Sequence, residues 1–330
     1  MNQDKRAFNW AILGTGVVAN EMAEALTNAG KKIYAVGNRT HSKAIEFANK
    51  YHINKVYDDF HEMFTDPKVD IIYITTPHNT HIDFLMVALA HGKHVLCEKS
   101  ITLNSEELER AKALAEEKRV VLAEAMTIYH MPLYKKLRAM VASGVLGEVR
   151  MIQLNFGSYK EYDMNNRFFN MSLAGGALLD IGVYAITLAR CFMISKPNKI
   201  ASQVKYAPSG ADEQSGILMM NDEGEMAVLA LTLHSKQPKR AMISCDKAYI
   251  EIMEYPRAAE ATITYTATGE KEVIQLGEGS KALQYEMEDM ERAVGGEQDE
   301  MMLPYTTDVM EIMTAIRKEW GMYYEGEKEK

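Results

Sequence analysis

The chain has 330 residues, of which 47% are hydrophobic and 25% charged, a balance that fits a globular protein of two domains. Its formal charge of −9 at pH 7 argues against a nucleic-acid or anionic-membrane surface. The cysteines, Cys97, Cys191 and Cys245, form no Cys-x-x-Cys pair and indicate neither a disulfide framework nor a zinc knuckle. Because the sequence has no apolar signal segment and no uninterrupted apolar run long enough to cross a bilayer, we expect a cytoplasmic protein without membrane contact.

A glycine turn follows the first short apolar run of the chain. Within residues 9–19, Gly14 permits a tight turn and Gly16 leaves the backbone open to a diphosphate. The helix expected at 17–29 would aim its free N–H groups at the phosphates. The alternative is a glycine turn of purely steric origin. A second strand expected at 32–36 begins a βαβ unit and favours the nucleotide site.

The residue that follows this second strand bears on cofactor choice. Dinucleotide sites for NAD usually place Asp or Glu there, whereas this chain reads Gly37-Asn38-Arg39-Thr40. A carboxylate would repel a 2′-phosphate, but Arg39 could pair with it and stack on the adenine. The alternative is a solvated surface arginine. We therefore expect NADP rather than NAD.

Two further apolar strands end in polar loops. Asp70–Thr75 leads into the loop 76–81, TPHNTH, and His94–Glu98 leads into Lys99. Ligands of parallel sheets bind at the carboxyl ends of the strands. The two histidines of the loop have no Cys or carboxylate at ligand spacing, so we expect a cofactor-lining loop and no metal. At this edge the Lys99 ammonium could assist an acid–base group, the alternative being an ordinary surface lysine.

Strand and helix patterns alternate through the first part of the chain. Helices are expected at 42–51, 60–64, 82–89 and 104–118, with strands near Val56 and at 120–125. This order predicts a parallel sheet covered by helices on both faces. We therefore expect residues 1–126 to form a Rossmann dinucleotide-binding domain of α/β class.

Beyond residue 126 the pattern changes to that of an α+β domain. Helices are expected at 132–143, 177–192, 283–294 and 307–320, and strands at 148–157, 200–206, 227–234, 242–244, 262–266 and 273–276. We expect residues 127–330 to bind substrate on a large, mostly antiparallel sheet whose free face forms a homodimer or homotetramer. The tail Glu325–Lys330 is expected to be a solvated end.

The helix expected at 177–192 carries two polar side chains of catalytic type. Its apolar residues form one stripe, and Asp180 and Tyr184, four residues apart, share another face. A tyrosine with an ordinary pKa near ~10 is a poor base at neutral pH, but a nearby Lys99 ammonium favours its phenolate. Tyr184, assisted by Lys99, could exchange a proton with a substrate hydroxyl or carbonyl. The alternative is a boundary tyrosine that packs its ring and exposes its hydroxyl.

The glycine turn, the Thr76-Pro77 loop, Gly92–Lys99 and Gly175–Tyr184 occur in an order that resembles the Gfo/Idh/MocA family of NAD(P)-dependent oxidoreductases. The resemblance covers nearly the whole chain and points to the branch with dihydrodiol dehydrogenases, NADP-dependent xylose dehydrogenases and glucose-fructose oxidoreductase. It implies that Lys99 and Tyr184 are catalytic, with Asp180 beside them. The cofactor contacts that it implies are Gly14, Thr15, Gly16, Val17, Val18, Asn38, Arg39, Thr76, Pro77, Asn79, His81, Glu98, Lys99, Arg167 and Tyr285.

The chain departs from this pattern at two places. Ser100 stands where the family has proline, which removes a rigid bend after Lys99. Thr127 and Tyr129 stand where the dihydrodiol branch carries Trp and Arg. The loss of an indole favours a small polyhydroxylated substrate, such as an aldose or diol, over a flat aromatic one. The resemblance thus implies NADP-dependent hydride transfer on a CH–OH or C=O group, and the Ser100 departure leaves a non-catalytic NADP(H)-binding sensor or scaffold as the alternative.

Overall fold

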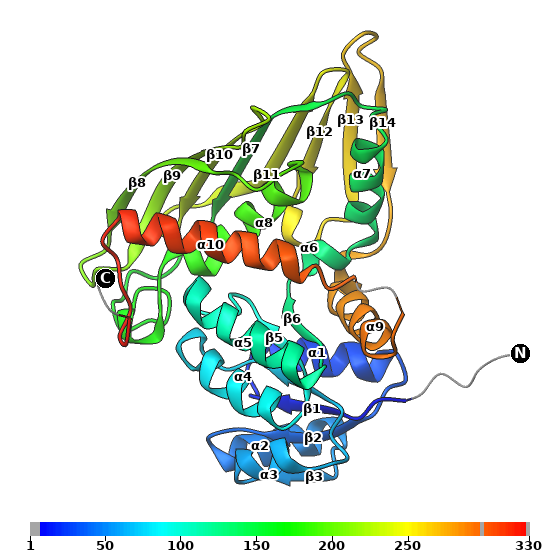
Figure 1. Cartoon of the computed structure of the whole chain (residues 1–330), viewed down its shortest axis with the longest axis vertical. Coiled ribbons are helices and arrows are strands. Elements are labelled where there is room, and N and C mark those ends of the chain that lie inside the picture. Colours follow the sequence, from blue (N-terminus) through cyan, green and yellow to red (C-terminus); the bar gives the residue numbers. More distant parts are fainter. Residues whose placement is uncertain (1–6, 298–299, 328–330) are drawn as a thin grey trace, which may run out of the picture. The chain divides into compact units, whose positions relative to one another are not determined.

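The computed structural model describes residues 7–297 and 300–327 (Figure 1). Their contacts define two compact units. Unit 1 contains the described residues of Met1–Thr102, Glu106–Met126 and Leu283–Leu303. Unit 2 contains Leu103–Ser105, Thr127–Ala282 and the described residues of Pro304–Lys330.

Unit 1 contains a six-stranded, all-parallel sheet in the order β3-β2-β1-β4-β5-β6. Its strands are β1 (Trp10–Leu13), β2 (Ile33–Gly37), β3 (Lys55–Tyr57), β4 (Ile71–Ile74), β5 (His94–Glu98) and β6 (Leu122–Ala125). Its helices are α1 (Val17–Asn28), α2 (His41–Tyr51), α3 (Phe60–Thr65), the 3₁₀ turn η1 (His78–Thr80), α4 (His81–Ala90), α5 (Ser105–Lys118) and α9 (Ala282–Val294). The strand order reverses between β1 and β4, and ligands of such sheets bind beside this point.

Helix α9 explains why unit 1 includes a segment from late in the chain, which the sequence pattern assigned to the second domain. The Glu291 carboxylate accepts hydrogen bonds from Trp10 Nε1 at 3.1 Å and from Lys31 Nζ at 2.5 Å. Trp10 itself is completely buried. A helix distant in sequence is therefore hydrogen-bonded to β1 and to the segment between α1 and β2.

Unit 2 contains an eight-stranded sheet in the order β14-β13-β12-β11-β7-β10-β9-β8. The strands are β7 (Val149–Gly157), β8 (Lys199–Tyr206), β9 (Asp212–Met220), β10 (Met226–Thr232), β11 (Gln237–Cys245), β12 (Ala248–Met253), β13 (Glu260–Tyr265) and β14 (Lys271–Gln275). The helices are α6 (Thr127–His130), α7 (Pro132–Ala142), η2 (Met171–Leu173), the π-helical turn η3 (Leu178–Gly182), α8 (Val183–Phe192), η4 (Tyr255–Arg257), η5 (Gly279–Lys281) and α10 (Leu303–Glu319). Strands β7 and β10 pair in parallel and the other neighbours antiparallel.

The two faces of this sheet differ in burial. One register row, Met219–Ala227–Ile152–Ile243–Ile250–Ile263, is buried, and α8 packs against β7 and β10. The neighbouring row, Ala201–Leu218–Val228–Gln153–Met242–Glu251–Thr262–Val273, lies on the opposite face and includes the exposed side chains of Leu218, Val228 and Val273. One face of the sheet therefore forms the core of unit 2.

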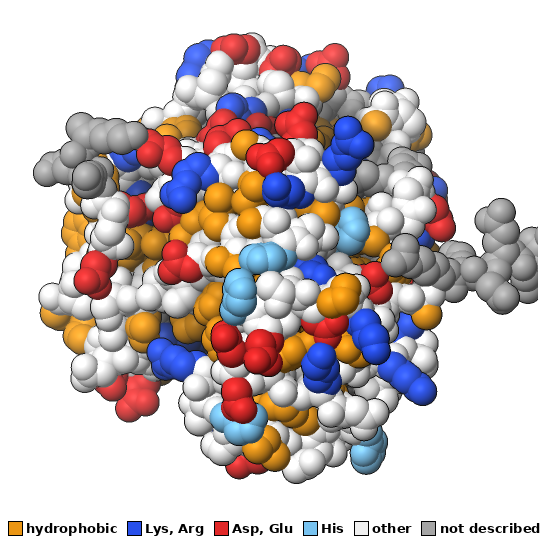
Figure 2. All heavy atoms as spheres, turned by 60° about the horizontal axis from the view of Figure 1, so that its bottom comes forward, with side chains coloured by type: hydrophobic (Ala, Val, Ile, Leu, Met, Phe, Trp, Pro, Cys, Tyr) orange, Lys and Arg blue, Asp and Glu red, His pale blue; other side chains and the backbone are white. Residues whose placement is uncertain are grey.

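The expected fold class, a Rossmann domain plus an α+β domain with a large, mostly antiparallel sheet, is confirmed. Strands β9 and β12 were not predicted. Met171–Phe192 has the length and composition of a membrane span, but 72% of its most apolar window is buried, as in the core helix of a globular fold. On the face in Figure 2, acidic and basic side chains are interspersed, which is typical of a solvated surface.

Candidate nucleotide and substrate site

In the glycine turn after β1, Gly14 packs closely against the end of a neighbouring strand, whereas Gly16 faces open space. Gly14 has φ +111°, and a Cβ there would lie 2.3 Å from Thr75 Oγ1 after β4. The Gly14 N–H donates to the Gly37 carbonyl at the end of β2, at 2.8 Å. At Gly16, by contrast, a Cβ would meet no atom within 4 Å. Glycine is therefore required at position 14 by packing, whereas position 16 offers bare backbone beside open space.

The N-terminus of α1 suits an anionic ligand. Gly16 is its N-cap, without a side-chain cap, and the first turn contains no acidic residue. Thr15 and Val18 are half-buried, and Val17 is 77% exposed. Free N–H groups, the positive end of the helix dipole and an open approach together fit a phosphate.

Asn38 and Arg39 follow β2, the strand beside β1. The Asn38 side-chain amide donates to the Thr40 carbonyl at 3.0 Å and closes a short turn. The Arg39 side chain is exposed. This cation therefore stands at the carboxyl edge of the sheet, next to the strand that carries the glycine turn.

Two histidines connect the loops that follow β4 and β5. The His81 ring is completely buried, with Nδ1 2.9 Å from the Ser100 carbonyl oxygen and Nε2 2.8 Å from that of Thr76. His78 Nε2 lies 3.0 Å from the Lys99 carbonyl oxygen. Burial lowers the pKa of His81, against the opposing effect of the carbonyls. The structure thus places the His81 side chain behind the loop, as a link, and not on its surface.

Lys99 lies at the end of β5, half-buried, on the same edge as the glycine turn. The preceding Glu98 accepts a hydrogen bond from the buried Tyr73 hydroxyl. Ser100, at the position of the family's proline, is fully buried, and the Lys99–Ser100 peptide bond is cis.

The other expected contacts in unit 1 are positioned as follows. Thr76 Oγ1 accepts a hydrogen bond from Thr80 Oγ1 at 2.9 Å, Pro77 is exposed, Asn79 is half-buried in η1, and Tyr285 is half-buried on α9. Unit 1 thus brings the expected residues after β1, β2, β4 and β5 to one edge of its sheet.

Asp180 and Tyr184 lie one turn apart where η3 continues into α8. Both are half-buried, and the expected apolar stripe of Leu178, Ile181, Ala185, Leu188 and Phe192 is buried, which confirms that part of the pattern. Arg167 Nη1 is 3.8 Å from Asp180 Oδ1, and the Arg167 side chain is 62% exposed. Unit 2 thus presents a carboxylate, a phenol and an exposed guanidinium together.

The surroundings of Tyr184 include aromatic residues that the sequence did not indicate. Its ring centre lies 6.1 Å from that of Phe156, which is 5.9 Å from that of Tyr255. Tyr255 is buried, and its hydroxyl has no hydrogen-bond partner among the described residues. Burial raises the pKa of Tyr255, and Tyr184 adds to the effect. Thr127 Oγ1 donates to the Pro256 carbonyl at 2.6 Å, so the residue that stands where the dihydrodiol branch carries Trp holds the turn that contains Tyr255.

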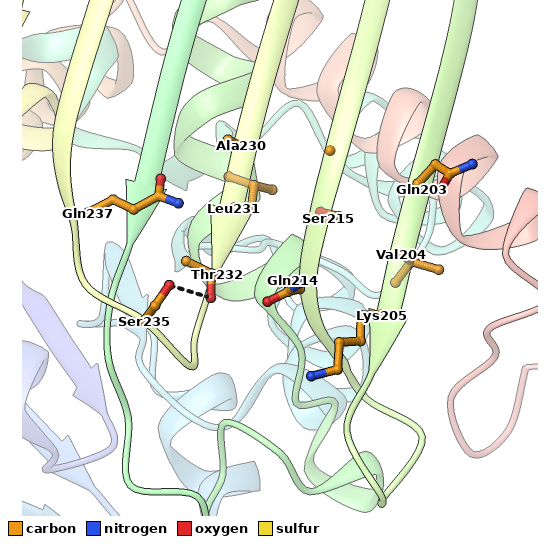
Figure 3. A pocket seen from close by; sticks show the side chains of 11 residues that line it. Gln203, Val204, Lys205, Gln214, Ser215, Ala230, Leu231, Thr232, Ser235 and Gln237 are labelled. Carbon is orange, nitrogen blue, oxygen red and sulfur yellow. Dashed lines mark hydrogen bonds between the residues drawn. The ribbon is translucent and has the colours of Figure 1, made fainter.

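A separate groove of 390 Å³ lies on the sheet of unit 2 (Figure 3). It is lined by Gln203, Val204, Lys205, Gln214, Ser215, Gly216, Ala230, Leu231, Thr232, Ser235 and Gln237. Small residues of the exposed face, Gly216 and Ala230, lie among polar ones. The expected catalytic residues do not line this groove, so it is distinct from the Asp180–Tyr184 pair. Across residues 7–297 and 300–327, no three His, Cys, Asp or Glu side chains are grouped to hold a metal ion.

Comparison with known proteins gives matches in both units. Residues 8–126 match the oxidoreductase family with an NAD-binding Rossmann fold, and residues 134–251 match the GFO/IDH/MocA C-terminal domain. A trans-1,2-dihydrobenzene-1,2-diol dehydrogenase from Mus musculus is 31% identical over 254 residues, 75% of each chain. A 3-ketoreductase from Actinomadura kijaniata, solved with NADP and TDP-benzene, has a TM-score of 0.84 at 20% identity, covering 94% of this chain and 97% of that one. For a UDP-N-acetylglucosamine 3-dehydrogenase from Acidithiobacillus ferrooxidans the TM-score is 0.82 at 19% identity, with coverage of 94% and 97%.

Proposed function

Because the chain belongs to the Gfo/Idh/MocA family of oxidoreductases, we propose that it transfers a hydride between NADP and a CH–OH or C=O group of a sugar or diol. The observation that carries this proposal is the pairing of Asp180 and Tyr184, half-buried and one turn apart, in a chain whose other unit has an open glycine turn. In this proposal residues 1–126 and α9 bind the dinucleotide. The rest of residues 127–330 binds the substrate.

The residues of unit 1 fit a dinucleotide. The backbone of Gly14, Thr15 and Gly16 and the first N–H groups of α1, from Val17 and Val18, would hold the diphosphate. Asn38 and Arg39 would bind the adenosine ribose, and the loops after β4 and β5 would line the nicotinamide end. When bound, the nicotinamide supplies or accepts the hydride.

The proton is assigned to the Tyr184 hydroxyl. In the direction of oxidation this oxygen takes the proton of the substrate hydroxyl, and in reduction it returns it. Asp180, with Arg167 beside it, would orient a neighbouring hydroxyl of the substrate. Lys99 is assigned to stabilise the phenolate, because a nearby ammonium favours the charged form.

A polyhydroxylated substrate agrees with the local chemistry of unit 2. Thr127 removes an indole from this region, and carboxylate, phenol and guanidinium groups are hydrogen-bonding partners for hydroxyls. The similar proteins include a dihydrodiol dehydrogenase, a 3-ketoreductase and a dehydrogenase that is named for a nucleotide-linked sugar. These names support the class of substrate, a sugar or diol, without selecting one member.

A substrate screen tests the proposal. Aldoses, inositols and dihydrodiols are incubated with the full chain and NADP, and formation of NADPH is followed by absorbance. Turnover of at least one sugar or diol is expected. Tight NADPH binding without turnover of any of them would contradict the proposal and favour a sensor or scaffold.

Arg39→Ala is expected to weaken NADP binding about tenfold or more and NAD binding much less. The 2′-phosphate that the guanidinium would pair with is present only in NADP, whereas stacking on the adenine is common to both dinucleotides. Titration calorimetry of wild type and variant with each dinucleotide measures both affinities. Lys32→Ala serves as the control, because it removes an exposed cation just before β2, away from the carboxyl edge of the sheet, and it should change neither affinity. A wild type that prefers NAD, or an equal loss for both dinucleotides, would refute this assignment.

The exposed face of the unit 2 sheet is proposed as a homodimer or homotetramer interface. Leu218, Val228, Met253 and Val273 are 41%, 40%, 53% and 56% exposed on it, and Leu218 and Val228 are register partners on neighbouring strands. Val228→Lys is expected to weaken self-association at least about tenfold, because the interface would bury a charge. Sedimentation velocity measures this. A wild type that sediments as a monomer at micromolar concentration would contradict the interface.

A further inference from the structure

A turn that contains Gly175 and Gly176 directly precedes the helix that carries Tyr184. Gly176 has φ +140°, and a Cβ on it would lie 2.0 Å from Asp212 Oδ1 and 3.3 Å from the Tyr324 hydroxyl oxygen. A Cβ on Gly175 would lie 2.7 Å from the Arg167 carbonyl oxygen. The turn is therefore enclosed from several sides by residues distant in sequence.

Asp212, the first residue of β9, holds the beginning of the helix. Its Oδ2 accepts a hydrogen bond from the Leu178 N–H at 2.7 Å, and the side chain is completely buried. Leu178 opens the π-helical turn that contains Asp180 and leads directly into Tyr184. A buried acceptor at this point fixes where the helix starts.

Tyr324, in the segment that follows α10, contacts the same turn. Its hydroxyl donates to the Gly175 carbonyl at 2.9 Å, and the side chain is 3% exposed. Both contacts therefore converge on the four residues 175–178, which precede Asp180 and the proposed acid–base group, Tyr184.

A buried ion pair keeps Tyr324 in place. Arg317, on α10, donates to both carboxylate oxygens of Glu327, at 2.7 and 2.8 Å, and its guanidinium lies 4.6 Å from the centre of the Tyr324 ring. Glu327 also accepts from the Tyr324 N–H at 2.7 Å and from the Asn104 amide at 2.8 Å. Hydrogen bonds of this charge-assisted, two-pronged kind fix geometry as well as adding stability.

We propose that Tyr324 and Asp212 are positioning residues of the reaction, which fix the turn 175–178 and thereby the orientation of Tyr184. Arg317 and Glu327 act one step further away, by holding Tyr324 against the turn. The inference rests on the proposed function in one respect: Tyr184 is the acid–base group. The segment after α10 thus influences catalysis by positioning Tyr184, without itself touching substrate or cofactor.

The test compares Tyr324→Phe with Tyr323→Phe in the full chain. Tyr324→Phe removes only the hydroxyl and keeps the ring beside Arg317, so the fold is retained. Amide hydrogen exchange of residues 176–186 is expected to accelerate several-fold, and kcat to fall about five- to tenfold, the range of one hydrogen bond. The KM for NADP should stay unchanged. Tyr323→Phe, in the half-buried neighbour, should change none of these quantities.

A purely structural contact would lower the melting temperature and leave kcat of the folded enzyme unchanged, and that result would overturn the proposal. Unchanged exchange in residues 176–186 would overturn it as well. If wild type turns over no substrate, the proposed function fails separately, and the exchange comparison still decides whether Tyr324 holds the turn. Glu327→Gln, which weakens the ion pair from outside the turn, should reproduce the Tyr324→Phe exchange pattern more weakly.

Discussion

Tyr184→Phe is expected to lower kcat by about 10²–10⁴-fold, the usual contribution of one general acid–base group. The substitution removes one oxygen atom and leaves a ring that still packs beside Phe156, so the helix and its buried stripe are preserved. Because the proposed dinucleotide contacts lie mainly in unit 1, the affinity for NADPH should stay within about twofold. Steady-state kinetics with the substrate found in the screen and NADPH titration by fluorescence measure the two quantities.

The Tyr323→Phe variant controls for the general effect of losing a tyrosine hydroxyl in unit 2. It should retain wild-type kcat. If Tyr184→Phe also retains wild-type kcat, the proton passes through another group and the assignment of Tyr184 is wrong. A loss of NADPH affinity equal to the loss of activity would instead make Tyr184 a binding residue.

Asp212→Asn is expected to change how stability depends on pH. Burial raises the pKa of Asp212 to about 7 from the ordinary 3.8, against the opposing effects of the Leu178 N–H and the Arg317 charge. Tyr324 and Tyr206 are the other titratable groups that it influences. Because the folded state binds this proton more tightly than the unfolded chain, the stability that the carboxyl contributes is fully present below pH 3.8 and is lost as the pH rises through about 7.

Asparagine does not ionise but keeps an oxygen for the Leu178 N–H. The free energy of unfolding of Asp212→Asn, minus that of wild type, should therefore increase by about 4 kcal/mol between pH 4 and pH 8, at 1.36 kcal/mol for each unit of pKa shift. Urea unfolding of both proteins at several pH values gives this difference. A difference that is constant with pH would show that Asp212 has an ordinary pKa in the folded protein.

The sequence predicted the parallel sheet well because its strands are covered on both faces. β1 and β4 are completely buried and read as short, continuous apolar runs between polar loops. The glycines of the first turn predicted the edge at which the expected unit 1 residues meet. The stripe on η3 and α8 likewise follows from local periodicity, which needs no knowledge of partners distant in the chain.

Strand β9 escaped prediction for a physical reason. It begins with two acidic residues, Asp212 and Glu213, and contains Gly216. Both carboxylates are buried, but their partners are distant in sequence: the Leu178 N–H for Asp212, and Lys205 Nζ at 2.5 Å with the Tyr162 hydroxyl at 2.6 Å for Glu213. From sequence alone an acidic residue is predicted to be exposed, because burial requires partners that the sequence does not reveal.

The same dependence on distant contacts explains two other differences. The histidines of the loop 76–81 were recognised as loop residues, but their role as links to the carbonyls of Lys99 and Ser100 requires the fold. The tail was expected to be solvated from Glu325 onward, whereas Glu327 pairs with the buried Arg317, and residues 328–330 lie outside the described part of the chain. Charged segments at chain ends are usually solvated, so only the partner reveals the exception.

The proposed reaction requires Lys99 and Tyr184 to act on one substrate, although they belong to different units. A crystal structure of the full chain with NADP and a sugar or diol substrate tests this directly. We expect the Lys99 amine and the Tyr184 hydroxyl both to lie within hydrogen-bonding distance, about 2.6–3.2 Å, of the reacting substrate oxygen or of each other beside it. A structure in which the two groups open onto different cavities, or in which the dinucleotide does not lie beside Gly16, would contradict the proposed enzyme.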